Sequence, residues 1–320
     1  MVASDPFVHL QVASGFSLRH GASHPHVLVE RAVDHGMDAL ALTDRDGVYG
    51  AVRFALACQS AGIAPILGVD LAVEPPPTPG STAPRRKTPA RGGDEVDRRL
   101  PRVSVLAEGR QGWAALCRLV STAHLGTVPG QVTPATGVTE RRRDPAVTME
   151  QVAQAAAGGS LGVVLGPQSD VAHALSRHRP DLAGQVLGGW RHAVGDASLL
   201  LQTVSHRASG DRLTPGSTRH AAQMLGLARQ HHLSVVLGNS VRYADPSDAQ
   251  VVDVLDAARR LVPLHPRHLD RLNAEGYLKS GKEMLEIAED VVRAAGGGES
   301  EVTRLLRDTR AVGERFALDP

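Results

Sequence analysis

The chain has 320 residues and a mass of 33.8 kDa, and 42% of its residues are apolar, so it can bury one large α/β core or two modest ones. Its 35 basic and 34 acidic residues leave a net charge of +1, which gives no reason to expect a strongly basic nucleic-acid-binding surface. Neither cysteine belongs to a CxxC pair, which excludes a disulfide scaffold and a zinc ribbon. The N-terminus lacks a signal-peptide pattern, and no apolar run reaches the roughly 20 residues that span a bilayer. We therefore expect a cytoplasmic protein without membrane contact.

The first 71 residues alternate between strand-like and helix-like patterns. Strands are predicted at 7–12, 39–43 and 66–71, and helices at 25–35 and 51–61. A glycine follows the end of each helical pattern, at Gly36 and Gly62, as is typical of helix ends. This spacing predicts parallel strands joined by right-handed crossovers, with polar side chains gathered at the carboxyl ends of the strands.

Two irregular stretches, about 74–101 and about 126–146, are rich in proline, glycine and charge and are predicted to be flexible surface insertions. Further strands are predicted at 103–107, 161–165, 199–204 and 234–237, and a helix at 113–124. The C-terminal part is helical, with patterns at 249–261, 281–295 and 300–316. About seven strands alternating with helices predict one barrel over residues 1–260 and a helical tail over residues 261–320.

Several strings occur in an order that is specific for one family. They are FVHLQVASGFSLRHGA, LTDRDGVYGAVRF, AGIAPILGVDLAV, VSVLAEGRQGWAALCRLVSTAHL, VVLGNSVRYADPSDAQVVDVLDAAR, GYLKSGKEMLEIAED and TRAVGERFALD. Together they resemble the N-terminal PHP domain of the alpha subunit of bacterial DNA polymerase III, especially its error-prone branch. The resemblance covers nearly the whole chain outside the two irregular stretches, and it implies a PHP-type distorted (β/α)7-like barrel with a helical C-terminal tail.

The family's pocket binds metal ions through His, Asp, Glu and Cys side chains at the strand ends, and this sequence departs from that pattern at most positions. The positions of the family's ligands fall on Gln11, Ala13, Arg45, Arg102, Pro167, Ser240 and Arg242. Ligand-capable chemistry remains at His20 and Asp70, and Asp44 survives beside Arg45. The resemblance therefore implies a degenerate pocket made of Gln11, Ala13, His20, Asp44, Arg45, Asp70, Arg102, Ser240 and Arg242.

Arginine has no free lone pair and keeps its charge, so it cannot replace a metal ligand. We expect Arg45, Arg102 and Arg242 to pair with Asp44 and Asp70, holding the barrel mouth together where ions would otherwise do so. Alternatively, the arginines bind an anion such as phosphate. We expect no catalytic residue, no metal site and no cofactor. His206 ends a predicted strand and could reach the mouth, but a solitary histidine is more often structural.

The resemblance implies the PHP region of an error-prone polymerase that acts in DNA replication and repair synthesis. The palm carboxylates and their magnesium ions belong to a polymerase body beyond these residues, so this chain alone is expected to be a structural or docking module. Its expected partner is the polymerase body of the same or a cognate chain, and DNA only indirectly. Two alternatives remain open: a free-standing PHP phosphoesterase similar to histidinol phosphatase, or an anion- or nucleic-acid-binding module. Whether the chain is an enzyme stays open.

Overall fold

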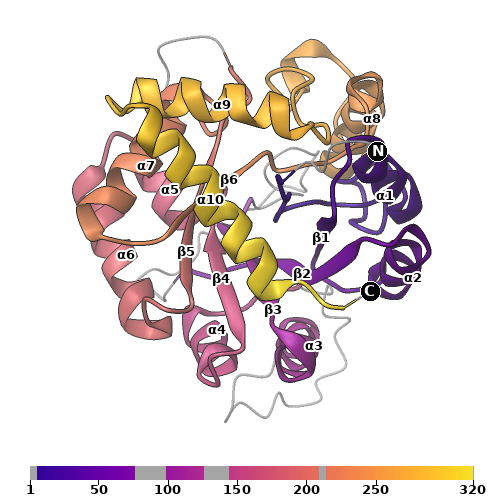
Figure 1. Ribbon diagram of the computed structural model, residues 1–320, viewed down its shortest axis with the longest axis horizontal. Coiled ribbons are helices and arrows are strands. Elements are labelled where there is room, and N and C mark those ends of the chain that lie inside the picture. Colours follow the sequence, from indigo (N-terminus) through magenta and orange to yellow (C-terminus); the bar gives the residue numbers. More distant parts are fainter. Residues whose placement is uncertain (1–5, 76–98, 126–143, 209–213, 320) are drawn as a thin grey trace, which may run out of the picture.

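A single curled sheet forms the centre of the computed structural model, which describes residues 6–75, 99–125, 144–208 and 214–319. Its six strands follow one another across the sheet in chain order (Figure 1). They are β1 (Ala39–Arg45), β2 (Ala64–Ala72), β3 (Arg102–Ala107), β4 (Leu161–Leu165), β5 (Leu199–Val204) and β6 (Val235–Gly238). Helices cover the outside of the curl, so the predicted α/β class with a distorted barrel is confirmed.

The strand directions confirm the predicted parallel pairing of β1 and β2 and add one antiparallel strand. β1 and β2 are parallel, as are β4, β5 and β6, but β3 runs antiparallel to both of its neighbours. An antiparallel neighbour needs no crossover helix, and none lies between β2 and β3 among the described residues. As a result, the first residue of β3 lies at the edge of the sheet where β1 and β2 end.

The predicted first strand at 7–12 is wrong as a regular strand, because only Val12 forms a ladder bridge, to Val241. The segment nevertheless closes the curl. On one side, the N–H of Thr43 donates to Val12 O over 2.8 Å, and on the other the N–H of Val241 donates to Gln11 O over 3.0 Å. The Val12 N–H donates to the side-chain Oγ1 of Thr43 over 3.0 Å, which interrupts the regular backbone pattern.

Small and branched side chains cover the inner face of the sheet. The C-terminal helix packs against this interior at the end of the curl opposite the carboxyl ends of β1 and β2. This interior cluster contains Val8, Leu10, Ala39, Ala41, Ile66, Leu106, Val164, Leu200, Val236 and Phe316. Phe316 ends α10 (Glu299–Phe316), is fully buried and lies against Gly162 at the start of β4. α10 crosses the sheet in Figure 1.

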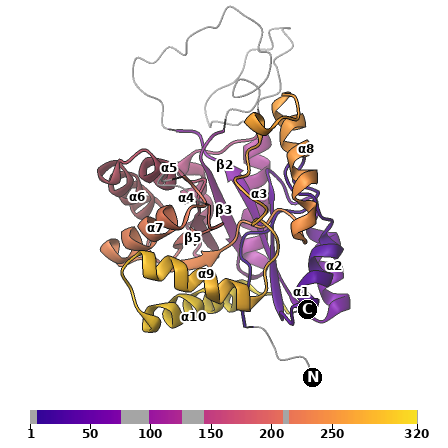
Figure 2. The ribbon, with the colours of Figure 1, turned by 90° about the horizontal axis from the view of Figure 1, so that it is seen from above.

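The remaining helices form the outer layer. They are α1 (Pro25–Asp34), α2 (Ala51–Ala61), α3 (Gly109–Leu125), α4 (Met149–Ala156), α5 (Asp170–Ser176), α6 (Pro180–Val194), α7 (Thr218–His231), α8 (Ala249–Arg260) and α9 (Gly281–Ala294), with short 3-10 turns η2 (Pro246–Asp248) and η3 (Pro266–His268). Figure 2 shows α1, α2 and α8 on one flank, α5 and α6 on the other, and α9 beside α10. No helix in the described ranges is long and apolar enough to cross a membrane.

Most of the two predicted insertions, residues 76–98 and 126–143, lies outside the described residues. Their flanks meet beside β2, where the N–H of Val147 donates to Ala72 O over 2.9 Å. The boundary at residue 260 stays a prediction. The helices after it pack directly on the sheet, since Met284 and Val302 share one buried cluster with Leu237 of β6.

Candidate functional site

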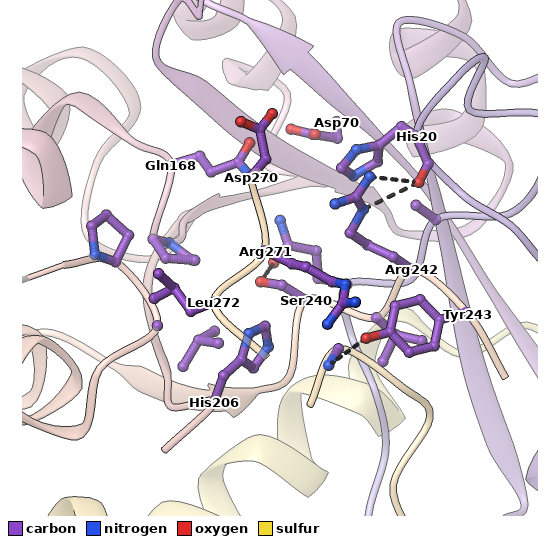
Figure 3. Close-up of a pocket in the computed structure, with 18 of the residues that line it drawn as sticks. His20, Asp70, Gln168, His206, Ser240, Arg242, Tyr243, Asp270, Arg271 and Leu272 are labelled. Atoms are coloured by element: carbon purple, nitrogen blue, oxygen red, sulfur yellow. Dashed lines mark hydrogen bonds between the residues drawn. The ribbon is translucent and has the colours of Figure 1, made fainter. Parts of the chain in front are cut away.

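A cavity of about 160 Å³ opens at the end of the sheet where β1 and β2 finish (Figure 3). Seven of the nine residues predicted for the pocket line it: Gln11, Ala13, His20, Arg45, Asp70, Ser240 and Arg242. Arg102 lies behind this lining, and Asp44 is buried away from it. The fold therefore brings these seven residues, which are up to 231 positions apart in the sequence, together at one end of the sheet, as the alternation of strands and helices predicts.

The ion pair between Arg102 and Asp70 joins β3 to β2 at the edge of the cavity. Arg102 Nε donates to Asp70 Oδ2 over 2.9 Å, and its Nη2 donates to Asp46 Oδ1 and to the backbone oxygen of Asp70, both over 2.7 Å. Burial lowers the pKa of Arg102, but the carboxylates of Asp70 and Asp46 outweigh it and raise the pKa above its ordinary value. The guanidinium is thus held charged at this position, as expected.

Arg45 shares the same carboxylate less closely. Its Nε lies 3.4 Å from Asp70 Oδ2, and its Nη2 donates to Gln168 Oε1 over 2.7 Å. Burial first, and then the charge of Arg102, lowers the pKa of Arg45 from its ordinary value to about 9. A lowered pKa means that the protein compensates this guanidinium incompletely.

The expectation that Asp44 pairs with an arginine is wrong. Its carboxylate accepts hydrogen bonds from the backbone N–H of Ser14 over 2.7 Å and from the hydroxyl of Ser17 over 2.7 Å, and the Ser14 hydroxyl also donates to it. Burial raises the pKa of Asp44, and these donors oppose that rise. Asp44 therefore fastens the loop after the closing segment to β1 and does not face the cavity.

Arg242 pairs with an aspartate that sequence reasoning missed. Its Nη2 and Nη1 donate to the two oxygens of Asp256 in α8 over 2.7 and 3.0 Å, and its Nε and Nη2 donate to the backbone oxygen of His20 (Figure 3). The predicted partners, Asp44 and Asp70, are not involved. A polar stripe on α8, in which Asp253, Asp256 and Arg260 recur at helical spacing, is the signal that could have indicated this pairing.

The segment between α8 and α9 also reaches the cavity, which the sequence did not indicate. Asp270, Arg271, Leu272 and Asn273 line the mouth, with Arg271 held by two hydrogen bonds of 2.6 Å to Asp253. These residues follow an irregular stretch without periodicity, so no pattern in the sequence could assign them to the mouth.

Inside the cavity, neutral polar side chains stand at the family's ligand positions in the segment at 7–12 and after β6. Ser240 Oγ donates to Gln11 Oε1 over 2.7 Å, and Gln11 Nε2 donates to Ser104 Oγ over 3.1 Å. Ala13 contributes only a methyl group. This chain of neutral groups ties the closing segment to β3 and to the residues after β6.

Two histidines line the cavity. Burial first, and then the charges of Arg242 and Arg45, hold the pKa of His20 well below its ordinary value, and its Nδ1 has no hydrogen-bond partner in the described structure. His206 reaches the mouth, and the lowering of its pKa to about 4 by burial leaves it neutral. Its Nε2 bonds to the backbone oxygen of Asn239 over 2.8 Å. The two imidazoles are thus neutral groups in a positively charged setting.

The residues of this pocket do not fit a cluster of divalent ions. Within the described ranges, no group of three or more His, Cys, Asp or Glu side chains is arranged to hold a metal ion. The one cavity carboxylate at a family ligand position, Asp70, already bonds to Arg102 and lies next to Arg45. Guanidinium groups repel cations and offer no lone pair, so the donor set opposes metal binding.

The sequence profile of the PHP domain family matches residues 9–206, which include β1 to β5 and most of the cavity's polar residues. The chain belongs to the PHP domain family.

Among its relatives are error-prone DNA polymerases. The one from Symbiobacterium thermophilum is 31% identical over 286 residues, which is 88% of this chain and 23% of the relative. The one from Mycobacterium tuberculosis is 31% identical over 305 residues, which is 93% of this chain and 25% of the relative. The chain thus spans about a quarter of the length of these relatives.

Similar solved structures include an amidohydrolase from Chromobacterium violaceum, with a TM-score of 0.47, 15% identity, and coverage of 73% of this chain and 87% of that one. A second is a two-domain protein from Bacteroides vulgatus described as containing a predicted PHP-like metal-dependent phosphoesterase. It has a TM-score of 0.40 and 11% identity, over 92% of this chain and 72% of that one.

Proposed function

We propose that this chain is the PHP region of an error-prone DNA polymerase system, and that its pocket is a structural joint without hydrolytic activity. The relatives at 31% identity support the polymerase connection. The chain would contact the polymerase body, in the same or a cognate polypeptide, and would take part in replication and repair synthesis only through it. A cytoplasmic location is part of this proposal.

The observation that carries the structural role is the guanidinium of Arg102 on Asp70. In a metal-dependent member of this family, a ligand at the start of the equivalent strand would face the ion. Here the Arg102 side chain joins β2, β3 and the turn at Asp46 through three hydrogen bonds. A buried guanidinium with two carboxylate partners can link strands as a bound ion would, but it supplies no hydroxide for hydrolysis.

The hydrolytic part of the proposal is tested on the 320-residue chain, purified without chelators. We expect less than stoichiometric zinc, manganese or iron by plasma mass spectrometry. We also expect no hydrolysis of p-nitrophenyl phosphate or of single-stranded DNA above the blank, with or without added Mn²⁺. Stoichiometric metal together with turnover would overturn the structural role and favour a phosphoesterase.

The polymerase connection is tested in the source cells. An antibody raised against this chain should detect a polypeptide well above 33.8 kDa, or a 33.8 kDa polypeptide that co-precipitates a polymerase subunit. A 33.8 kDa polypeptide that co-precipitates no polymerase subunit would contradict the connection, and it would leave the barrel a free-standing protein.

A further inference from the structure

Arg45 is a largely buried guanidinium that uses few of its five N–H donors. Its side chain is 13% exposed, and the structure gives it one side-chain hydrogen bond, from Nη2 to Gln168 Oε1. Its Nε has no hydrogen-bond partner in the described structure, and Asp70 is already bound more closely by Arg102. Buried charged groups are normally satisfied. In the described structure Arg45 Nε lacks an acceptor and Asp70 Oδ1 lacks a donor, so a bound group that supplies both would complete the site.

The surroundings of Arg45 are positive. Burial and the charges of Arg102, Arg242 and Arg259 lower the pKa of Arg45, and the carboxylate of Asp70 opposes them. His20 experiences a similar field, since burial and then the charges of Arg242 and Arg45 lower its pKa most. An anion between Arg45 and His20 would therefore be attracted by several charges in a partly desolvated site.

The cavity has the size and the donors for one small oxyanion. Its volume of about 160 Å³ is several times what a single water molecule needs, so a tetrahedral oxyanion can enter. His20 is 7% exposed, lines the cavity, and has no partner for its ring nitrogen Nδ1 in the described structure. Figure 3 shows His20, Gln168 and Asp70 around the same end of the cavity, with Arg242 next to the His20 ring.

Two residues at or next to the cavity have a left-handed backbone conformation, as do six other non-glycine residues of the described chain. Ser240, which lines the cavity, has φ of 45°, and Asp46, beside Arg45, has φ of 59°. Residues other than glycine adopt this left-handed region rarely, and such residues cluster at binding sites. The surrounding structure thus maintains the shape of the pocket at a conformational cost.

We propose that this cavity binds a single phosphate group, either free or at the end of a phosphate monoester, without metal and without hydrolysis, through Arg45 with His20 and Gln168. Arg45 is the principal binding residue, because its planar donors suit a phosphate oxygen pair. Arg242 contributes positive charge, since its own donors are occupied by Asp256 and His20. Phosphate is favoured over a carboxylate because it offers more acceptor oxygens to these donors and, when monoprotonated, a hydroxyl to Asp70 Oδ1. This inference goes beyond the structural role and does not depend on a polymerase.

The test is isothermal titration calorimetry of the 320-residue chain at constant ionic strength, with inorganic phosphate, a nucleoside 5′-monophosphate, the corresponding nucleoside and acetate. We expect saturable binding of phosphate at about 10 mM or below, and none of the nucleoside. Tighter binding of the monophosphate than of phosphate would identify a monoester as the source of the group. Equal binding of the nucleoside or of acetate would overturn the proposal, as would no binding of either phosphate ligand.

Variants assign the site. Arg45→Gln should weaken phosphate binding about tenfold or more, because a charged hydrogen-bond donor is lost. Arg179→Gln is the matched control, since Arg179 is 57% exposed and pairs with Asp181 outside the cavity. Binding by Arg45→Gln at wild-type strength would contradict the assignment. Should Arg45→Gln fail to fold, Arg45→Lys keeps the charge but loses the planar donor pair, and it should still bind several-fold more weakly.

A spectroscopic measurement needs no variant. In a sample with ¹⁵N-labelled arginine, one buried Nε–H signal should move on addition of phosphate and return after dialysis. No shift of any arginine Nε–H signal at saturating phosphate would overturn the role of Arg45. Failure to bind phosphate would leave the proposed function intact, because metal content and the size of the cellular polypeptide test that function separately.

Discussion

Arg102 and Asp70 meet diagonally across two antiparallel strands, with Arg102 Nε 2.9 Å from Asp70 Oδ2. The register pairs Asp70 with Ser104 and Ala72 with Arg102, so the two side chains are two residues apart along the ladder. At that spacing a long side chain reaches its diagonal neighbour. The reversed direction of β3 thus delivers a fixed positive charge to the place where the strands β1 and β2 end.

Arg102→Met should destabilise the protein by about 3 kcal/mol or more, because it leaves the Asp70 carboxylate, whose side chain is 9% exposed, with only the more distant Arg45. The free energy of unfolding in urea measures this. The double variant Arg102→Met with Asp70→Leu should lose less than the single one, since it removes the uncompensated charge. A control, Arg179→Met, should change stability by less than about 0.5 kcal/mol. A loss for Arg102→Met as small as that of the control would contradict the importance of the pair.

Restoring two histidines should not restore a metal site. In the variant Gln11→His with Ala13→His, the guanidinium groups of Arg45 and Arg242 remain beside the cavity and repel divalent cations. We expect no stoichiometric zinc or manganese by plasma mass spectrometry in a variant whose circular dichroism spectrum matches that of the wild type. One bound ion per chain would show that the arginines do not control this pocket.

Phe316→Ala should cost about 4 kcal/mol in the free energy of unfolding, because Phe316 is fully buried in the interior of the curl. Leu285→Ala, on the 39% exposed side chain of Leu285 in α9, should cost below about 1 kcal/mol. Chemical denaturation of both variants measures the difference. Comparable losses would mean that α10 is a detachable appendage and not the lower wall of the barrel.

Acid should remove stability through His9. This residue is fully buried, and burial lowers its pKa from 6.5 to about 4. Lys279 and His35 also lower the pKa, whereas Glu283 and the hydrogen bond to the Lys279 carbonyl raise it. The unfolded chain therefore binds a proton at a pH where the folded chain does not. The contribution of His9 is complete above pH 6.5, and about 3 kcal/mol is lost as the pH falls to about 4.

The variant His9→Gln tests this, because glutamine can keep the hydrogen bond to Lys279 O but does not titrate. Between pH 6.5 and 4, its free energy of unfolding should fall less steeply than that of the wild type. The exposed His192→Gln is the control and should follow the wild-type slope. A His9→Gln slope equal to that of the wild type would show that His9 is protonated in the folded protein or is not buried.

The sequence by itself predicted most of the secondary-structure elements and most of the residues that line the pocket. Periodicity located all six strands and six of the ten described α-helices, because a half-buried strand or helix repeats its apolar residues at a fixed interval. It gave no bounds for α4 to α7. The ordered motifs identified the family, and they placed seven residues in the cavity, because positions at strand ends are local features of the chain. The substitution of arginine for ligand residues was also readable, since the identity of each side chain is given directly.

Only the tertiary structure decided which charged residues of the pocket pair with one another. The direction of β3 follows from residues far apart in the chain, and it sets Arg102 on Asp70 while Asp44 turns to Ser14 and Ser17. Arg242 pairs with Asp256 because α8 packs beside the barrel. The same packing places residues 270–273, which follow α8, at the mouth of the cavity. A charged side chain can pair with any opposite charge that the fold brings near. When the groups are buried, the favoured pairing is the one that leaves no charged group without a partner, because an unpaired buried charge costs free energy.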